Sequence, residues 1–136
     1  MVEQAFTISF RVRHPVYPHH VIVQSLDMAP KFAHTVGAPR MTPRGEPLDG
    51  VYKETYCSFS LIDRQNGWFT DGVNQALPSL ASHREFLRSI SDTGGCAELY
   101  VGVFVDGDTT GFTMDIEMMA ALADLRVQLS AEFYCD

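Results

Sequence analysis

The sequence contains no long hydrophobic run and few cysteines. None of its apolar stretches approaches the roughly 20 residues that a membrane-spanning helix needs, so we expect no membrane association. The opening residues, MVEQAFTISF, lack a basic segment followed by an apolar block, which argues against a secretory signal. The three cysteines, Cys57, Cys96 and Cys135, are widely spaced and include no Cys-x-x-Cys pair. We therefore expect reduced thiols and a cytoplasmic location.

Catalytic and cofactor-binding motifs are also missing. The sequence has no Gly-x-Gly-x-x-Gly, no phosphate-binding P-loop, no Gly-x-Ser-x-Gly and no His-Glu-x-x-His. Cys57 and a histidine would in principle form a nucleophilic pair. However, Cys57 falls on the same predicted strand face as Phe59 and Leu61, which is typical of a buried structural thiol. We therefore expect no cofactor, and an enzyme is the least favoured class.

Positive charge is scarce in the second half of the chain. Residues 1–60 carry six lysines and arginines against five acidic residues, whereas residues 61–136 carry four against twelve. The net charge of −7 therefore arises in the second half. Nucleic-acid binding needs basic surface, so we expect no nucleic-acid partner. The acidic half either keeps the protein soluble or faces a basic partner protein.

What the sequence does contain is the pattern of one globular domain spanning residues 1–136. Hydrophobic residues make up 46% of the chain and charged residues 20%, and 136 residues suffice to bury a single core. Period-two alternation and β-prone runs predict strands over residues 5–13, 52–62, 97–105, 112–116 and 127–134. Helical patterns predict helices over residues 18–26, 73–90 with a break near Pro78, and 117–125.

These elements predict an α+β fold. A turn is expected at Asn66–Gly67, a capping box starts a helix at Ser82, and Asp115 caps the last helix. The resulting order, β-α-β-α-α-β-β-α-β, predicts a two-layer sandwich, in which a mainly antiparallel five-stranded sheet has helices on one face. We expect the first and last strands to lie inside this sheet, and the order of strand pairing stays open.

The segment HPVYPHH, residues 14–20, holds three histidines and two prolines. A zinc site needs three or four converging ligands, and His14 and His19 can approach each other across the turn, with His34 or a cysteine as a third ligand. No spacing here matches a known zinc pattern, however, and the prolines end the preceding strand. We interpret the segment as a structural corner and predict no metal.

Residues 27–50 are rich in proline and glycine and predict a long irregular loop. Loops of this length inside a compact domain are uncommon and often functional. Arg40 and Arg44 from this loop, together with Tyr56 and Trp68, would form an aromatic and cationic pocket for a small anionic ligand. The alternative is a surface loop that packs its own aromatic residues.

Several stretches, in order along the chain, carry a resemblance to a known family. They are HHVIVQSL, VGAPR, YKETYCSFSL and FTMDIEMMAALADLRVQLSAEFY. The chain resembles a bacterial family described as domain of unknown function 4279. The resemblance implies a fold and a bacterial origin but no activity.

Three functional classes follow from these observations. The leading hypothesis is a non-catalytic module that binds a protein partner, as immunity proteins do, because catalytic motifs are missing and the second half is acidic. The alternative is a small anionic-ligand binder that uses the loop of residues 27–50. The third is an enzyme of unrecognised type. The sequence leaves the oligomeric state open.

Overall fold

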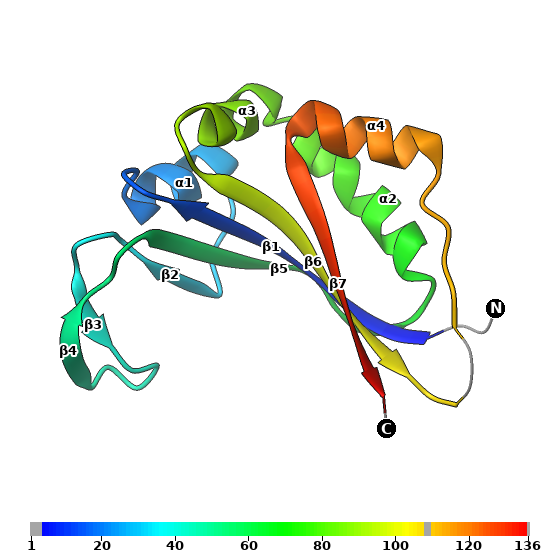
Figure 1. Cartoon of the computed structure of the whole chain (residues 1–136), viewed down its shortest axis with the longest axis horizontal. Helices are drawn as coiled ribbons and strands as arrows, with labels where there is room; N and C mark the ends of the chain where they lie inside the picture. The colour runs from blue at the N-terminus through cyan, green and yellow to red at the C-terminus, as the bar shows by residue number, and fades with distance from the viewer. Residues whose placement is uncertain (1–3, 108–109, 136) are drawn as a thin grey trace.

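Over residues 4–107 and 110–135, which the computed structural model describes, the chain forms a five-stranded sheet, a separate two-stranded sheet and four helices. The strands are β1 (Gln4–His14), β2 (Phe32–His34), β3 (Pro39–Met41), β4 (Pro47–Val51), β5 (Thr55–Gly67), β6 (Cys96–Val105) and β7 (Val127–Cys135). The helices are α1 (His19–Leu26), α2 (Phe69–Ala81), α3 (Arg84–Asp92) and α4 (Ile116–Leu125). All four helices lie on one side of the main sheet, so its other face is open (Figure 1).

Strand β1 is the centre of the main sheet. It pairs antiparallel with both β5 and β6. The inward side chains of its alternating sequence are at most 1% exposed: Phe6, Ile8, Phe10 and Val12. Burying four large apolar side chains on one face fixes the register, because a slip by one residue would turn them all outward. The position predicted for the first strand is therefore confirmed.

The strand order in the main sheet is β2-β5-β1-β6-β7. All pairs are antiparallel except β6 with β7, which are parallel and joined through helix α4. The α+β fold with a mainly antiparallel five-stranded sheet and helices on one face is therefore confirmed. The expectation that the last strand lies inside the sheet is wrong, because β7 forms an edge.

One predicted strand is replaced by another. Residues 112–115 form no strand, and Ile116 is the first residue of α4. The Asp115 side chain accepts a 2.7 Å hydrogen bond from the backbone N–H of Met118, which confirms the predicted cap. The fifth strand is instead β2, which lies within the loop predicted over residues 27–50 and pairs with β5.

Two other predicted boundaries are wrong. Strand β5 continues through the expected turn at Asn66–Gly67, because β1 offers pairing partners up to Gln4. Helix α3 begins at Arg84 without a side-chain cap, and the Ser82 hydroxyl donates to the carbonyl of Ser79 instead. The helical region is divided in two as expected, but after Ala81 rather than at Pro78.

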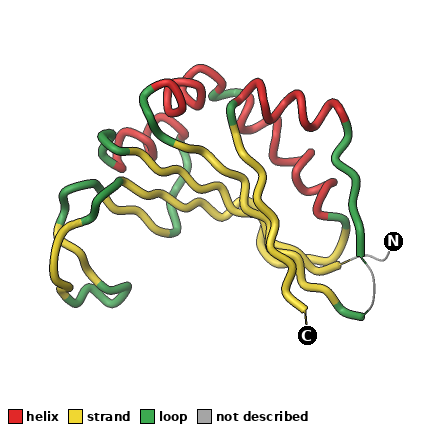
Figure 2. The backbone as a smooth tube through the Cα atoms, in the orientation of Figure 1, coloured by secondary structure: helices red, strands yellow, loops and turns green. Residues whose placement is uncertain are grey.

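Strands β3 and β4 form a hairpin that projects from the main sheet, which we call the arm (residues 39–51; Figures 1 and 2). Every residue of the arm is exposed except Thr42, which is half-buried. The tip is closed by hydrogen bonds between Thr42 and Glu46, one at 2.8 Å between the Thr42 N–H and the Glu46 carbonyl. The prediction of an irregular loop is therefore wrong for much of residues 27–50.

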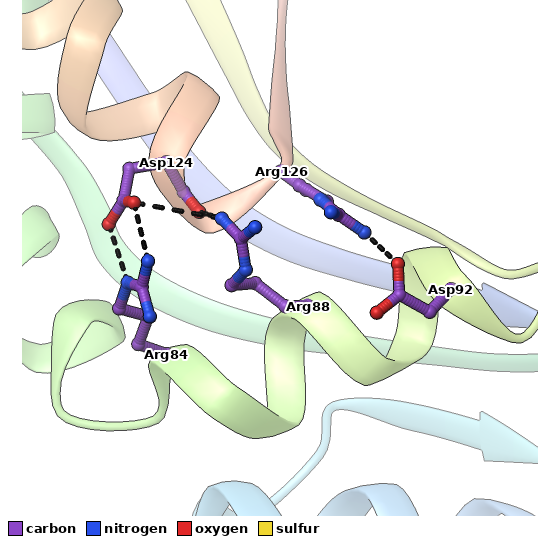
Figure 3. Close-up of polar contacts among 5 residues, drawn as sticks. All are labelled: Arg84, Arg88, Asp92, Asp124 and Arg126. Atoms are coloured by element: carbon purple, nitrogen blue, oxygen red, sulfur yellow. Dashed lines mark hydrogen bonds and ion pairs between the residues drawn. The ribbon is translucent and has the colours of Figure 1, made fainter.

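Ion pairs join α3 to the end of α4 (Figure 3). Arg84 donates two 2.8 Å hydrogen bonds to the Asp124 carboxylate, and Arg88 donates to the Asp124 carbonyl at 2.6 Å. Arg126 forms an ion pair with Asp92. The hydrogen bonds from Arg84 are the main reason that the pKa of Asp124 lies below its usual value. These three arginines therefore already have acidic partners.

Candidate binding groove

The arm is held at its base by a short network around Tyr52. Backbone hydrogen bonds join the Gly37 N–H to the Tyr52 carbonyl at 2.8 Å and the Tyr52 N–H to the Ala38 carbonyl at 3.0 Å. The Tyr52 ring stacks on His34 of β2, with ring centroids 3.6 Å apart and 8° between the planes. Its hydroxyl bonds the backbone of Met41 in β3. Tyr52 thus connects the arm to the edge of the main sheet.

Between the arm and β2 lies an open groove of about 570 Å³. Its walls are mainly aromatic and aliphatic side chains, with two histidines and two threonines: His19, Phe32, Ala33, His34, Thr35, Ala38, Pro39, Met41, Thr42, Pro43, Tyr52 and Tyr56. Phe32 and Met41 are 54% and 50% exposed, so large apolar side chains face solvent on both sides. A concave, mainly apolar surface of this size is typical of a binding site.

The two groove histidines differ in their surroundings. The His19 ring nitrogen Nδ1 lies 2.7 Å from the Thr35 hydroxyl, which also accepts from the His19 backbone N–H. Burial is the largest cause that lowers the pKa of His34, while the charge of Glu54 raises it. The groove is therefore lined at neutral pH by an uncharged His34 imidazole rather than by a cation.

The structure does not bring the four predicted ligand-binding residues together. Tyr56 lines the groove, but Arg40 lies in a different hollow, where its guanidinium donates to the Asp49 carbonyl at 3.1 Å. Arg44 is exposed in the turn at the tip of the arm. Trp68 follows the far end of β5, twelve residues beyond Tyr56. The two residues therefore lie at opposite ends of β5, and at about 3.3 Å per residue a straight strand would separate their backbones by up to roughly 40 Å.

The side chains of the histidine segment and of Cys57 lie in separate surroundings. His14 is 1% exposed and bonds Thr93, whereas His19 bonds Thr35, so their partners lie in different parts of the fold. Among the described residues, no group of three or more His, Cys, Asp or Glu side chains is placed to hold a metal. Burial raises the pKa of Cys57 to about 11, so its thiol is protonated at neutral pH. The three cysteines are free thiols.

The open face of the sheet carries arginines that lie over aromatic rings. The Arg11 guanidinium lies 3.6 Å from the centre of the Tyr100 ring, and Arg64 lies 3.9 Å from that of Phe104. Arg11 also faces the Glu98 carboxylate at 3.8 Å. Burial raises the pKa of Tyr100, which keeps its hydroxyl protonated. This face is therefore a mixed aromatic and charged surface in which these cations already have partners.

Sequence reasoning missed most of the groove. Its prediction included Tyr56 but not Phe32, His34, Met41 or Tyr52. The sequence does place aromatic residues at both ends of the proline-rich segment. The sequence patterns assign one end to a loop and the other to a strand, and do not predict that the two ends form opposite walls of a groove. Their approach depends on the pairing of β2 with β5, which no local pattern specifies.

Exposed large apolar side chains gather at the two ends of the sheet. Nine of the ten among the described residues belong to two groups. One group lies on β2 and the arm: Phe32, Met41, Leu48 and Val51. The other lies around α4 and β7: Phe112, Ile116, Met119, Phe133 and Tyr134. Within the second group, the Phe133 ring centroid lies 6.0 Å from that of Phe112, whereas Tyr134 lies on the opposite face of β7 against Phe104.

Comparisons with models of known families, with curated proteins and with solved structures found no match for this chain. Within the described ranges, no helix has the length and apolar character needed to cross a membrane.

Proposed function

We propose that the protein is a non-catalytic interaction module that binds an apolar segment of a partner protein in the groove between the arm and β2. The observation that carries this proposal is the exposure of Phe32 and Met41 on opposite sides of the groove. Burying such side chains against a partner gains about 25 cal/mol per Å² of apolar surface removed from water. If the chain belongs to the family of unknown function that it resembles, this proposal gives that family a binding role.

The construction of the arm supports this role. A two-stranded hairpin alone is marginally stable in water, and this one gains little from the core because its residues are exposed. Its attachment through Tyr52 lets it present Met41 toward the groove. A partner that fills the groove would stabilise the arm by contacts that the free protein does not have.

Strand β2 indicates how the partner segment would lie. Within the described chain β2 pairs with β5 on one side only, so its outer edge offers backbone groups for another strand. An extended segment added at such an edge gains main-chain hydrogen bonds, and alternate side chains enter the adjacent groove. We therefore expect the bound segment to be extended, with apolar residues at alternate positions.

Selection from a displayed library of random 12-residue peptides tests the proposal. Selection against the wild-type protein is expected to enrich peptides with alternating apolar residues. Met41→Glu places a charge in the groove and should weaken their binding at least tenfold, or about 1.4 kcal/mol. Met119→Glu is the matched control, because Met119 is 47% exposed at the other end of the sheet. It should leave peptide binding unchanged.

Two results would contradict the proposal. One is peptide binding that Met41→Glu does not weaken. The other is binding of inorganic phosphate that Arg40→Ala removes, with no peptide enriched, which would favour the small anionic-ligand hypothesis instead.

A further inference from the structure

Helix α4 is apolar on two sides. Its buried stripe consists of Met118, Leu122 and Leu125, none more than 4% exposed. At about 100° per residue, a second stripe, centred roughly 140° around the helix from the buried one, consists of Ile116, Met119, Ala120 and Ala123, all exposed. A helix that is apolar on both sides is typically covered on both sides. In this chain only one side is covered by the described residues.

Met119, at one margin of this second stripe, faces the free edge of the sheet. Helix α2 packs on β1 and β5, in the interior of the strand order, and it lines a small groove with Ala121 of α4. Met119 lies about 160° around the helix from Ala121, so it points away from α2. Since α4 packs beside β7, the side away from α2 is the side of the β7 edge.

Among the described residues, no strand pairs with the outer edge of β7. Edge strands are commonly blunted by proline, lysine or a bulge. The β7 sequence, VQLSAEFYC, contains neither proline nor lysine, and its pairing with β6 runs without a register shift. Its single charged residue is Glu132. On this strand Phe133 is 40% exposed, and its ring centroid lies 6.0 Å from that of Phe112, which also packs against Phe69 of α2 at 4.9 Å.

We propose that two copies of this chain form a dimer by antiparallel pairing of their β7 edges, with Met119 of each α4 helix beside the joint. A twofold axis at Ala131 pairs all nine residues of β7. This register places Leu129 opposite Phe133 of the second copy and Ser130 opposite Glu132. Apolar residues then face apolar ones, and the two Glu132 carboxylates are not directly opposed. The two five-stranded sheets become one.

The available surface suits this occupant. Each copy presents on the order of 300 Å² from Ile116, Met119 and Phe133, the exposed apolar side chains on α4 and on the helix-facing side of β7. The edge of a nine-residue strand brings this toward the roughly 800 Å² per partner of a standard interface. Because each copy carries a net charge of −7, added salt should strengthen the dimer.

Sedimentation equilibrium of the purified chain tests the dimer. We expect a species of twice the 15.2 kDa chain mass that dissociates on dilution. Met119→Glu should raise the dissociation constant at least tenfold, whereas Met41→Glu, at the groove, should not change it. The proposed groove function and the dimer can therefore fail independently. A monomer at all concentrations, or a dimer that Met119→Glu leaves intact, would overturn the inference.

Disulfide trapping tests the register. Directly opposite residues in an antiparallel pair have Cα atoms about 4.5–5.5 Å apart, within the range that a disulfide spans. In a Cys135→Ser background, Ala131→Cys should form a cross-linked dimer on mild oxidation. Tyr134→Cys is the matched control, since its two copies would lie six residues apart along the paired strands, roughly 20 Å. Cross-linking of the control but not of Ala131→Cys would overturn the proposed pairing.

Discussion

His14 shows how a buried polar side chain turns the chain at the end of β1. Its Nδ1 atom accepts hydrogen bonds from the backbone N–H groups of Val16 at 3.0 Å and Tyr17 at 2.8 Å. The proton of the neutral ring is therefore on Nε2, which donates to the Thr93 hydroxyl at 2.7 Å. Thr93 in turn donates to the carbonyl of Ser89. These bonds favour the corner interpretation of the histidine segment, because both ring nitrogens are used.

We expect this arrangement to make the protein less stable in mild acid. Burial lowers the pKa of His14 in the folded state below that of the unfolded chain, so the unfolded state binds more protons. The free energy of unfolding should therefore fall as the pH drops from about 6.5 through the folded-state pKa, by at most about 1.4 kcal/mol per pH unit for this residue. Urea unfolding at several pH values between 5 and 7.5 measures this change in the free energy of unfolding.

Substitution by asparagine separates His14 from the other histidines. His14→Asn keeps an acceptor for the turn but does not titrate, so the pH dependence should become shallower. The substitution should also lower the free energy of unfolding by about 1–3 kcal/mol at neutral pH, because the buried hydrogen bond from the His14 ring to Thr93 is lost. His20→Asn, at an exposed position of α1, should leave the slope unchanged. Equal slopes for His14→Asn and wild type would refute this account.

Two glycines set the distances at which elements pack. A Cβ atom on Gly95 would lie 2.6 Å from the His14 ring and 2.7 Å from the Arg13 carbonyl, and one on Gly72 would lie 2.7 Å from the Phe6 ring. We expect Gly95→Ala and Gly72→Ala each to lower the free energy of unfolding by roughly 1–3 kcal/mol, because neighbours must shift. Gly111→Ala, which meets nothing within 4 Å, should cost about 0.5 kcal/mol or less. Denaturant unfolding of the three variants checks this order, and equal losses would contradict it.

Sequence patterns predicted the strands that bury one face. In β1 and β6, most side chains that a strand pattern places inward are buried. The apolar pattern is visible in the sequence because these positions are buried. Residues 112–116 alternate in the same way, yet β7 occupies the edge of β6 where such a strand would pair. Alternation of apolar and polar residues therefore does not predict whether a neighbouring strand has an edge available for pairing. The Asp115 cap, which needs only the next three residues, was predictable.

The candidate site was less predictable than the fold because it joins distant segments. The prediction used composition, which favoured the cations Arg40 and Arg44 and the aromatic Trp68. The fold assigns these residues to the arm and to the far end of β5. The groove instead depends on the stacking of His34 on Tyr52, which are separated by the whole arm in sequence. The contact between His34 and Tyr52 forms because β2 pairs with β5 and because the β3–β4 hairpin returns the chain to the same place.

Local stability should differ widely across the molecule, and this difference bears on the binding role. Strand β1 is paired on both sides and its inward side chains are at most 1% exposed, so its amides should exchange only on global unfolding. The arm should open far more readily, because its hydrogen bonds are exposed and it is anchored mainly through Tyr52. Hydrogen exchange measured by mass spectrometry on peptides from residues 4–14 and 39–51 should show this contrast.

Tyr52→Ala tests whether the anchor sets the opening of the arm. It removes the stack on His34 and the bonds to Met41, so residues 39–51 should exchange several-fold faster while β1 is unchanged. Tyr134→Ala, a tyrosine at the other end of the sheet, should leave the arm unchanged. Equal protection of the arm and β1 in the wild type would show that the arm unfolds only with the core. In that case the groove would be a preformed rigid site, and a partner would gain nothing by ordering it.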